Sequence, residues 1–219
     1  YFLGILHSRA ENYGEAVKLL QNSLNIYKEK EILDKLAESY SALGIIEENA
    51  LDYDKALQAF SSSLKISEEI GEDLNRGREL RRIGRIFYLR LSRYDQAKVY
   101  FQQAYDLFKE IEQLDQVVET LLELGLVAEK QGDFDVALDR YQKAQNLAKE
   151  IDMKPGLSKA FLYQANSHWF QGNYQKAFKF QQKSLAIAEE ITDKRQKTFV
   201  YNTLGLIYWT LNDSSQALE

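Results

Sequence analysis

The stretch "ETLLELGLVAEKQGDFDVALDRYQKAQNLAKEI", residues 119–151, contains the pattern that decides the fold. Its first half repeats apolar residues at helical spacing, as at Leu121, Leu124 and Val127. The tripeptide QGD interrupts this spacing, and Asp133 is a good N-cap for a second helix that begins near Phe134. One side of this second helix is apolar and comprises Phe134, Ala137, Leu138, Tyr141, Ala144 and Leu147. The stretch therefore predicts a hairpin of two helices.

The same pattern recurs along the whole chain at a period of about 40 residues. A small residue lies within each first helix, in steps of 40, 40, 41, 40 and 40: Gly4, Gly44, Gly84, Gly125, Ala165 and Gly205. An alanine lies within each second helix, in steps of 40, 41, 40, 40 and 40: Ala16, Ala56, Ala97, Ala137, Ala177 and Ala217. An aromatic residue stands three positions before five of these alanines: Tyr13, Tyr53, Tyr94, Phe134 and Tyr174. Several independent columns in register identify a repeat protein.

We assign these columns to packing between helices. A glycine inside a helix costs about 1 kcal/mol of helix propensity relative to alanine, so a contact must compensate for it. The glycine allows the partner helix to approach closely, and the small alanine does the same from the other side. Both columns are therefore interpreted as structural.

The pattern resembles the tetratricopeptide repeat, and the resemblance covers essentially the whole chain. It rests on these residues and their equivalents in the other units: Leu124, Gly125, Gly132, Phe134, Ala137, Tyr141 and Ala144. The period of about 40 exceeds the usual 34. Such longer repeats are similar to the arrays in kinesin light chains, in cell-polarity scaffolds and in bacterial arrays fused to kinases, cyclases or proteases.

The resemblance implies an all-α fold, a right-handed α-solenoid of antiparallel helix hairpins that forms a single array over residues 1–219. We expect a partial repeat, four full repeats and a second partial repeat: 1–30, 31–72, 73–113, 114–153, 154–193 and 194–219. A solenoid needs polar caps at its ends, and neither partial repeat has one. The chain also begins with Tyr1. We therefore expect the native protein to continue in both directions, with end-to-end self-association through the apolar faces of the terminal units.

The composition favours a helical, cytoplasmic protein. The chain is 45% apolar and 28% charged, with a formal net charge of −5. It has no cysteine, so disulfides and thiolate metal sites are excluded. No apolar run approaches the roughly 18 residues of a membrane span, which argues against a membrane partner. The acidic balance makes nucleic acid an unfavourable partner.

No catalytic or cofactor-binding motif can be found in the sequence. The two histidines, His7 and His168, are four repeats apart and cannot share a metal ion. There is no glycine-rich phosphate loop and no arrangement of nucleophile and base. We therefore predict a protein that is not an enzyme and uses no cofactor or metal.

One segment concentrates basic charge in this acidic chain. Residues 76–93, "RGRELRRIGRIFYLRLSR", contain seven of its ten arginines. At about 100° per residue, four arginines form one stripe of a helix, with Tyr88 at its edge: Arg78, Arg81, Arg82 and Arg85. Leu80, Ile83 and Phe87 lie opposite and are expected to be the packing face.

The arginine stripe has two interpretations. By the family resemblance, first helices line a concave groove, so the stripe would face a ligand there. Guanidinium groups bind carboxylate or phosphate bidentately, which favours an anion site. Alternatively, the stripe forms a ladder of ion pairs with Glu119, Glu123 and Glu129 on the next first helix, worth about 0–1 kcal/mol per pair.

The later first helices have an aromatic character. The candidate binding residues are Tyr163, Asn166 and Trp169 in the fifth unit and Phe199, Asn202 and Trp209 in the sixth. An asparagine amide can both donate to and accept from an extended peptide backbone.

One subfamily of these repeats clamps the C-terminal carboxylate of a peptide with basic and asparagine side chains. Arg81, Arg85 and Asn166 match that clamp, but Ile5 and Ile45 stand where it requires asparagines.

We therefore predict a protein–protein interaction scaffold whose groove binds an acidic, partly apolar segment, supplied by another protein or by the same polypeptide. RNA binding through the arginine stripe, or a role as the regulatory sensor arm of a larger signalling enzyme or protease, are the alternatives.

Overall fold

The computed structural model describes residues 13–191 together with 201 and 205, and within these residues every regular element is an α-helix. In the described range 13–191, each of nine helices spans 17 residues: α2 (Tyr13–Glu29), α3 (Leu33–Asn49), α4 (Tyr53–Glu69), α5 (Asp73–Leu89), α6 (Tyr94–Glu110), α7 (Leu114–Lys130), α8 (Phe134–Glu150), α9 (Lys154–Phe170) and α10 (Tyr174–Glu190).

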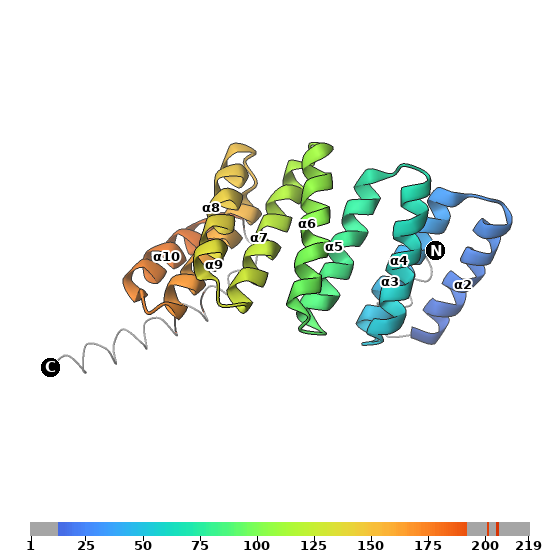
Figure 1. Cartoon of the computed structure of the whole chain (residues 1–219), viewed down its shortest axis with the longest axis horizontal. Coiled ribbons are helices and arrows are strands. Elements are labelled where there is room, and N and C mark those ends of the chain that lie inside the picture. Colours follow the sequence, from blue (N-terminus) through green and yellow to red (C-terminus); the bar gives the residue numbers. More distant parts are fainter. Residues whose placement is uncertain (1–12, 192–200, 202–204, 206–219) are drawn as a thin grey trace. The chain divides into compact units, whose positions relative to one another are not determined.

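Within each of two compact units, helices that follow one another in the chain pack against one another (Figure 1). The chain divides into two compact units, residues 1–112 and residues 113–219. In the first unit, α2 to α6 pack in sequence, each on the next. In the second unit, α7, α8, α9 and α10 do the same, and α7 also contacts α9. This arrangement confirms the predicted all-α solenoid of helix hairpins.

At the glycine column, a side chain of the second helix of a hairpin packs directly against the backbone of the first. A Cβ atom added at Gly125 would lie 2.3 Å from Cε1 of Tyr141, and one added at Gly44 would lie 2.4 Å from Cε1 of Phe60. Gly84 faces Phe101 in the same way, at 2.8 Å. An aromatic ring of the second helix thus occupies the space that a side chain would need, which confirms the packing role predicted for the column.

The fifth of the 40-residue repeats has different residues at both positions of this glycine–aromatic pair. Ala165 takes the place of the glycine, and Gln181 stands where the second, third and fourth repeats have Phe60, Phe101 and Tyr141. Both residues are fully buried. A larger residue on the first helix is therefore accompanied by a flexible side chain on the second, as close packing requires.

Local sequence signals set the helix boundaries. Asp133 caps α8 by accepting a hydrogen bond from the backbone N–H of Val136 at 3.4 Å, and Asp52 caps α4 in the same manner. Gly132, just before the cap, adopts a left-handed conformation with φ of 83°, which glycine tolerates best. The predicted cap at Asp133 and the helix start at Phe134 are confirmed.

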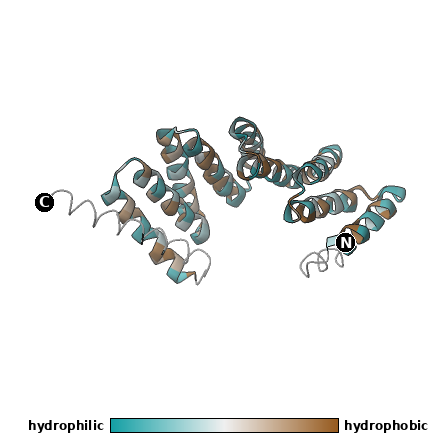
Figure 2. Ribbon diagram, turned by 90° about the horizontal axis from the view of Figure 1, so that it is seen from below, coloured by the Kyte–Doolittle hydropathy of each residue, from teal (hydrophilic) through white to brown (hydrophobic). Residues whose placement is uncertain are grey.

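The helices carry both apolar and polar residues along their length (Figure 2). On α5, Leu80, Ile83 and Phe87 are buried, as predicted from their spacing. The opposite side of α5 is therefore left to carry the arginines.

Candidate functional site

The arginine stripe lies on α5, a first helix of its hairpin. Arg78 and Arg85 are exposed, whereas Arg81 and Arg82 are half-buried. Arg81 and Arg85 also interact with other groups of the chain. Tyr88 is half-buried and stacks at an angle on Tyr94, with the ring centroids 5.9 Å apart.

Arg82 belongs to an internal network as well as to the stripe. Its Nη1 atom donates to Glu79 Oε1 at 2.5 Å and to the hydroxyl of Ser41 on α3, also at 2.5 Å. The guanidinium carbon lies 5.7 Å from the ring centroid of Phe60 on α4. Arg82 therefore ties three helices together and is less available to a ligand than Arg78.

Sequence reasoning missed Glu79, the acidic member of this network. Its side chain is only 3% exposed, and its Oε2 atom has no hydrogen-bond partner among the described residues. Burial raises the pKa of this carboxyl above its ordinary value, and Arg82 and Ser41 offset only part of that effect. A signal was present in the sequence, because the equivalent positions of the second, fourth and fifth repeats hold small uncharged residues: Ser39, Thr120 and Ala160.

A polar pocket of about 340 Å³ opens between α3 and α5 at this network. Arg78, Glu79 and Arg82 line it from α5, and Ser63 contributes from α4. On its other side are Ala37, Glu38 and Ser41 of α3. The pocket therefore lies between two successive first helices, on the side that the resemblance assigns to the groove.

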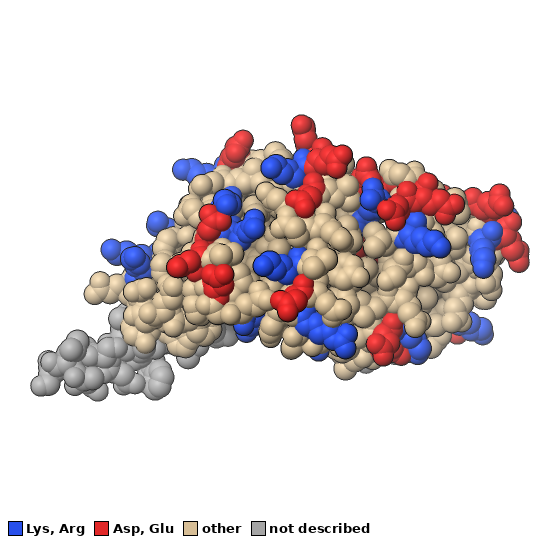
Figure 3. All heavy atoms as spheres, in the orientation of Figure 1, with Lys and Arg blue, Asp and Glu red and all other residues tan. Residues whose placement is uncertain are grey.

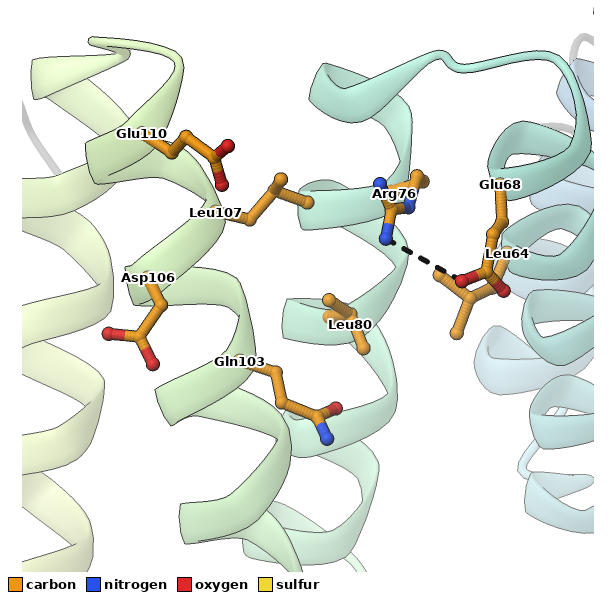
Figure 4. A pocket seen from close by; sticks show the side chains of 8 residues that line it. All are labelled: Leu64, Glu68, Arg76, Leu80, Gln103, Asp106, Leu107 and Glu110. Carbon is orange, nitrogen blue, oxygen red and sulfur yellow. Dashed lines mark ion pairs between the residues drawn. The ribbon is translucent and has the colours of Figure 1, made fainter.

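A second pocket, of about 470 Å³, lies on the side of the second helices (Figure 4). Leu64 and Leu107 come from α4 and α6, and Leu80 from α5 lies between them. Arg76 projects between α4 and α5, with its Nη2 atom 3.6 Å from Glu68 Oε1 and its Nη1 atom 2.5 Å from Asp73 Oδ1. This arginine is engaged at the helix junction and does not belong to the stripe.

Part of the predicted aromatic group lies on α9. Tyr163 packs against the buried Tyr141, with centroids 5.5 Å apart. Trp169 is half-buried and meets Phe170 edge-on at 5.1 Å, and Phe170 itself is 56% exposed. Asn166 is half-buried on the same helix. Three further candidates lie outside the described residues: Phe199, Asn202 and Trp209.

Two of the three acidic residues proposed for an ion-pair ladder have partners on α9. Glu119 accepts from Lys159 Nζ at 2.7 Å, and Glu129 accepts from the Ser167 hydroxyl at 2.5 Å. Burial raises the pKa of Glu129, while its hydrogen bond to Ser167 works in the opposite direction. These two carboxylates thus help to join α7 to α9.

We also searched the described part of the chain for a metal site, an unusual histidine and a membrane-spanning helix. No cluster of three or more potential metal ligands occurs there. His168 is half-buried and stacks on Phe180 at 5.4 Å, and desolvation lowers its pKa. None of the described helices is both long and apolar enough to cross a membrane. On the face drawn in Figure 3, basic and acidic side chains alternate over the helices.

Comparison with known proteins shows the family. The tetratricopeptide repeat model matches residues 1–69, 35–110, 80–150 and 157–219. The chain therefore belongs to the tetratricopeptide repeat family, whose repeats indicate a protein–protein interaction scaffold. No curated protein matches the sequence.

The fold is similar to that of several solved structures at low identity. BtubC (BKLC) from P. vanneervenii is 22% identical, with a TM-score of 0.78, over 87% of this chain and 78% of that one. The signal transduction ATPase with a tetratricopeptide repeat sensor from Pyrococcus horikoshii is 19% identical, with a TM-score of 0.77, over 99% of this chain and 37% of that one. The Rap protein complexed with Competence and Sporulation Factor is 17% identical, with a TM-score of 0.64, over 96% and 63%. At these identities the likeness shows the fold alone.

Proposed function

We propose that the first-helix side of this array binds an acidic, partly apolar polypeptide segment. The observation that carries the proposal is the row of arginines on α5, where Arg78 and Arg85 are exposed beside Arg81. Carboxylates of a ligand would gain charge-assisted hydrogen bonds from these guanidinium groups, which are stronger than bonds between neutral groups.

Exposed apolar side chains on the first helices support the apolar part of the proposal. Leu89 on α5 is 50% exposed, and Phe170 on α9 is 56% exposed next to Trp169. Aromatic residues are enriched among the anchors of protein interfaces because they bury a large area at low entropic cost. The first helices α5 and α9 thus carry exposed side chains of the kind that bind a partner.

The segment can come from another protein or from the same polypeptide. Two structural neighbours are consistent with these two sources: a Rap protein was solved with a bound factor, and an ATPase carries a tetratricopeptide repeat array as its sensor. RNA is the less suitable ligand, because acidic residues lie among the basic ones and would repel its phosphates (Figure 3).

The test is a charge-matched comparison of two double variants. Short fluorescein-labelled peptides combining glutamate with leucine and phenylalanine are titrated against the wild type, Arg81→Ala/Arg85→Ala and Arg90→Ala/Arg93→Ala. Arg90 and Arg93 are exposed and lie outside the stripe, so both variants lose the same charge. We expect the stripe variant to weaken binding by about 2–4 kcal/mol and the control to have little effect.

The free energy of unfolding should change by at most about 1–2 kcal/mol in the stripe variant, since exposed ion pairs contribute little. Equal weakening by both variants would show that only net charge matters. A change in stability without a change in binding would favour the ion-pair ladder. Tighter binding of a single-stranded RNA oligonucleotide than of any acidic peptide would favour the RNA alternative.

A further inference from the structure

The polar pocket between α3 and α5 has a property that the arginine stripe does not explain. Its volume of about 340 Å³ corresponds to about ten water molecules at roughly 30 Å³ each. Glu79 belongs to its lining, and the Oε2 atom of this side chain is buried without a hydrogen-bond partner among the residues that the structure describes. Buried polar atoms of this kind need an explanation, because leaving one unsatisfied costs free energy.

We propose that this pocket is a subsite for a primary carboxamide, the side chain of an asparagine or glutamine in the bound segment. The amide nitrogen would donate to Glu79 Oε2, and the amide oxygen would accept from the guanidinium of Arg78. This inference rests on the proposed function, because the carboxamide belongs to the segment that the first helices bind.

The charges of the lining favour a neutral ligand group. Glu38 and Glu79 contribute two negative charges, and Arg78 and Arg82 contribute two positive charges. A cationic group would gain from Glu79 but would lie next to both guanidinium groups. An anionic group would gain from Arg78 but would face a carboxylate that is already desolvated.

The hydrogen-bonding capacity of the lining favours an amide over a hydroxyl. Arg82 already donates to Glu79 Oε1 and to Ser41, and Ser63 donates to the backbone oxygen of Ala37 at 2.9 Å. These bonds leave Glu79 Oε2 as a buried acceptor, while the exposed Arg78 supplies a donor in the same lining. A primary carboxamide has two N–H donors and a carbonyl acceptor on one planar group, so it can serve both.

The position of Glu79 in the repeat sets the pocket apart from its equivalents. The column that holds Ser39, Thr120 and Ala160 elsewhere has a carboxylate only in this unit, and those residues are fully buried. Glu79 is also buried, yet its longer side chain reaches the pocket. The subsite is thus a feature of one repeat and would fix the position of a segment along the array.

The experiment uses three small probes of equal length: the N-acetyl methylamides of glutamine, glutamate and methionine. Each is titrated into the 219-residue chain at neutral pH, and binding is followed by NMR through the Nε–H signals of Arg78 and Arg82. We expect saturable shifts with the glutamine probe and binding weaker by about fivefold or more for the other two, the value of about one hydrogen bond.

The Glu79→Gln variant provides the decisive comparison. It exchanges an acceptor for a donor in the pocket without changing the shape of the side chain. We expect its preference to reverse, so that the glutamate probe binds more tightly than the glutamine probe. Equal binding of the glutamine and methionine probes to the wild type, an absence of saturable shifts, or an unchanged preference in Glu79→Gln would overturn the proposal.

The variant Arg81→Ala/Arg85→Ala separates this proposal from the previous one. Neither residue lines the pocket, so the preference for the glutamine probe should persist in this variant. If the wild type fails to bind acidic peptides but prefers the glutamine probe, the arginine stripe is not an anion site and the carboxamide subsite stands. If acidic peptides bind but no glutamine preference exists, the subsite is refuted and the anion site stands.

Discussion

At the scale of single residues, Glu79 is a carboxylate that is buried inside the protein, and burial changes its pKa. Its carboxylate is buried on α5, where the other first helices hold small side chains. Desolvation raises its pKa above the ordinary value of 4.5, although Arg82, Ser41 and Arg78 act in the opposite direction. The ionised form is therefore less favourable in the folded protein than in the unfolded chain.

This environment predicts a pH-dependent gain in stability for Glu79→Gln. Because the folded-state pKa is raised, the stabilising contribution of Glu79 is fully present below about pH 4.5 and is lost as the pH rises through the folded-state value. We expect the melting temperature of the variant, relative to the wild type, to increase between pH 4 and pH 7. Exposed Glu150 provides the control, since Glu150→Gln should show no such trend. A constant difference across the pH range would contradict the assignment.

The glycine at the helix crossing gives a second prediction at this scale. Gly125→Ala should gain about 1 kcal/mol of helix propensity, yet its new Cβ atom would lie 2.3 Å from the fully buried ring of Tyr141. We expect a net loss of about 1–3 kcal/mol in chemical denaturation, the usual cost of overpacking a core. Gly14→Ala is the matched control, because no atom lies within 4 Å of its added Cβ and it should be neutral or stabilising.

At the scale of the helix, the caps differ between otherwise similar hairpins. Asp133 accepts a hydrogen bond from the backbone of its own helix, α8, whereas Asn173 at the start of α10 makes no such bond with its side chain. Both helices have 17 residues, so α8 and α10 can be compared directly for the effect of the cap hydrogen bond. One hydrogen bond at a helix start satisfies a donor that the helix itself leaves free.

We therefore expect Asp133→Ala to lower the free energy of unfolding by about 1 kcal/mol. Asn173→Ala should cost less, because there is no cap bond to lose. Urea denaturation of both variants measures the difference. Equal losses would show that the hydrogen bond at Asp133 does not stabilise α8.

At the scale of the whole molecule, each helix is held mainly by its neighbours in the chain. In the first unit the contacts run from α2 to α6 in order, and in the second unit from α7 to α10. Stability in such an array is close to a sum of local terms, so a defect weakens the repeats around it first.

Hydrogen exchange of the Gly125→Ala variant tests this locality. We expect faster amide exchange in α7, α8 and α9, the helices in contact around the substitution, and unchanged exchange in α2 and α3. Uniform acceleration over all helices would instead show that the array unfolds as a single cooperative unit.

The sequence by itself determined the hairpins, the cap at Asp133 and the buried sides of helices such as α5 and α8. These features follow from spacings of three and four residues and from capping residues next to their own helix, so the local chain contains the information. It also indicated the glycine column, although only the structure showed that Phe60, Phe101 and Tyr141 fill the space.

The tertiary structure decided which charged groups meet. Arg82 binds Glu79 three residues away and Ser41 forty-one residues away, and Glu119 pairs with Lys159 forty residues away. Such partners depend on how closely two helices approach and which rotamers the space between them allows, and neither quantity is encoded in the spacing of one helix. For the same reason the sequence displayed the arginine stripe, while the pocket beside it and the buried carboxylate of Glu79 emerged only when α3, α4 and α5 packed together.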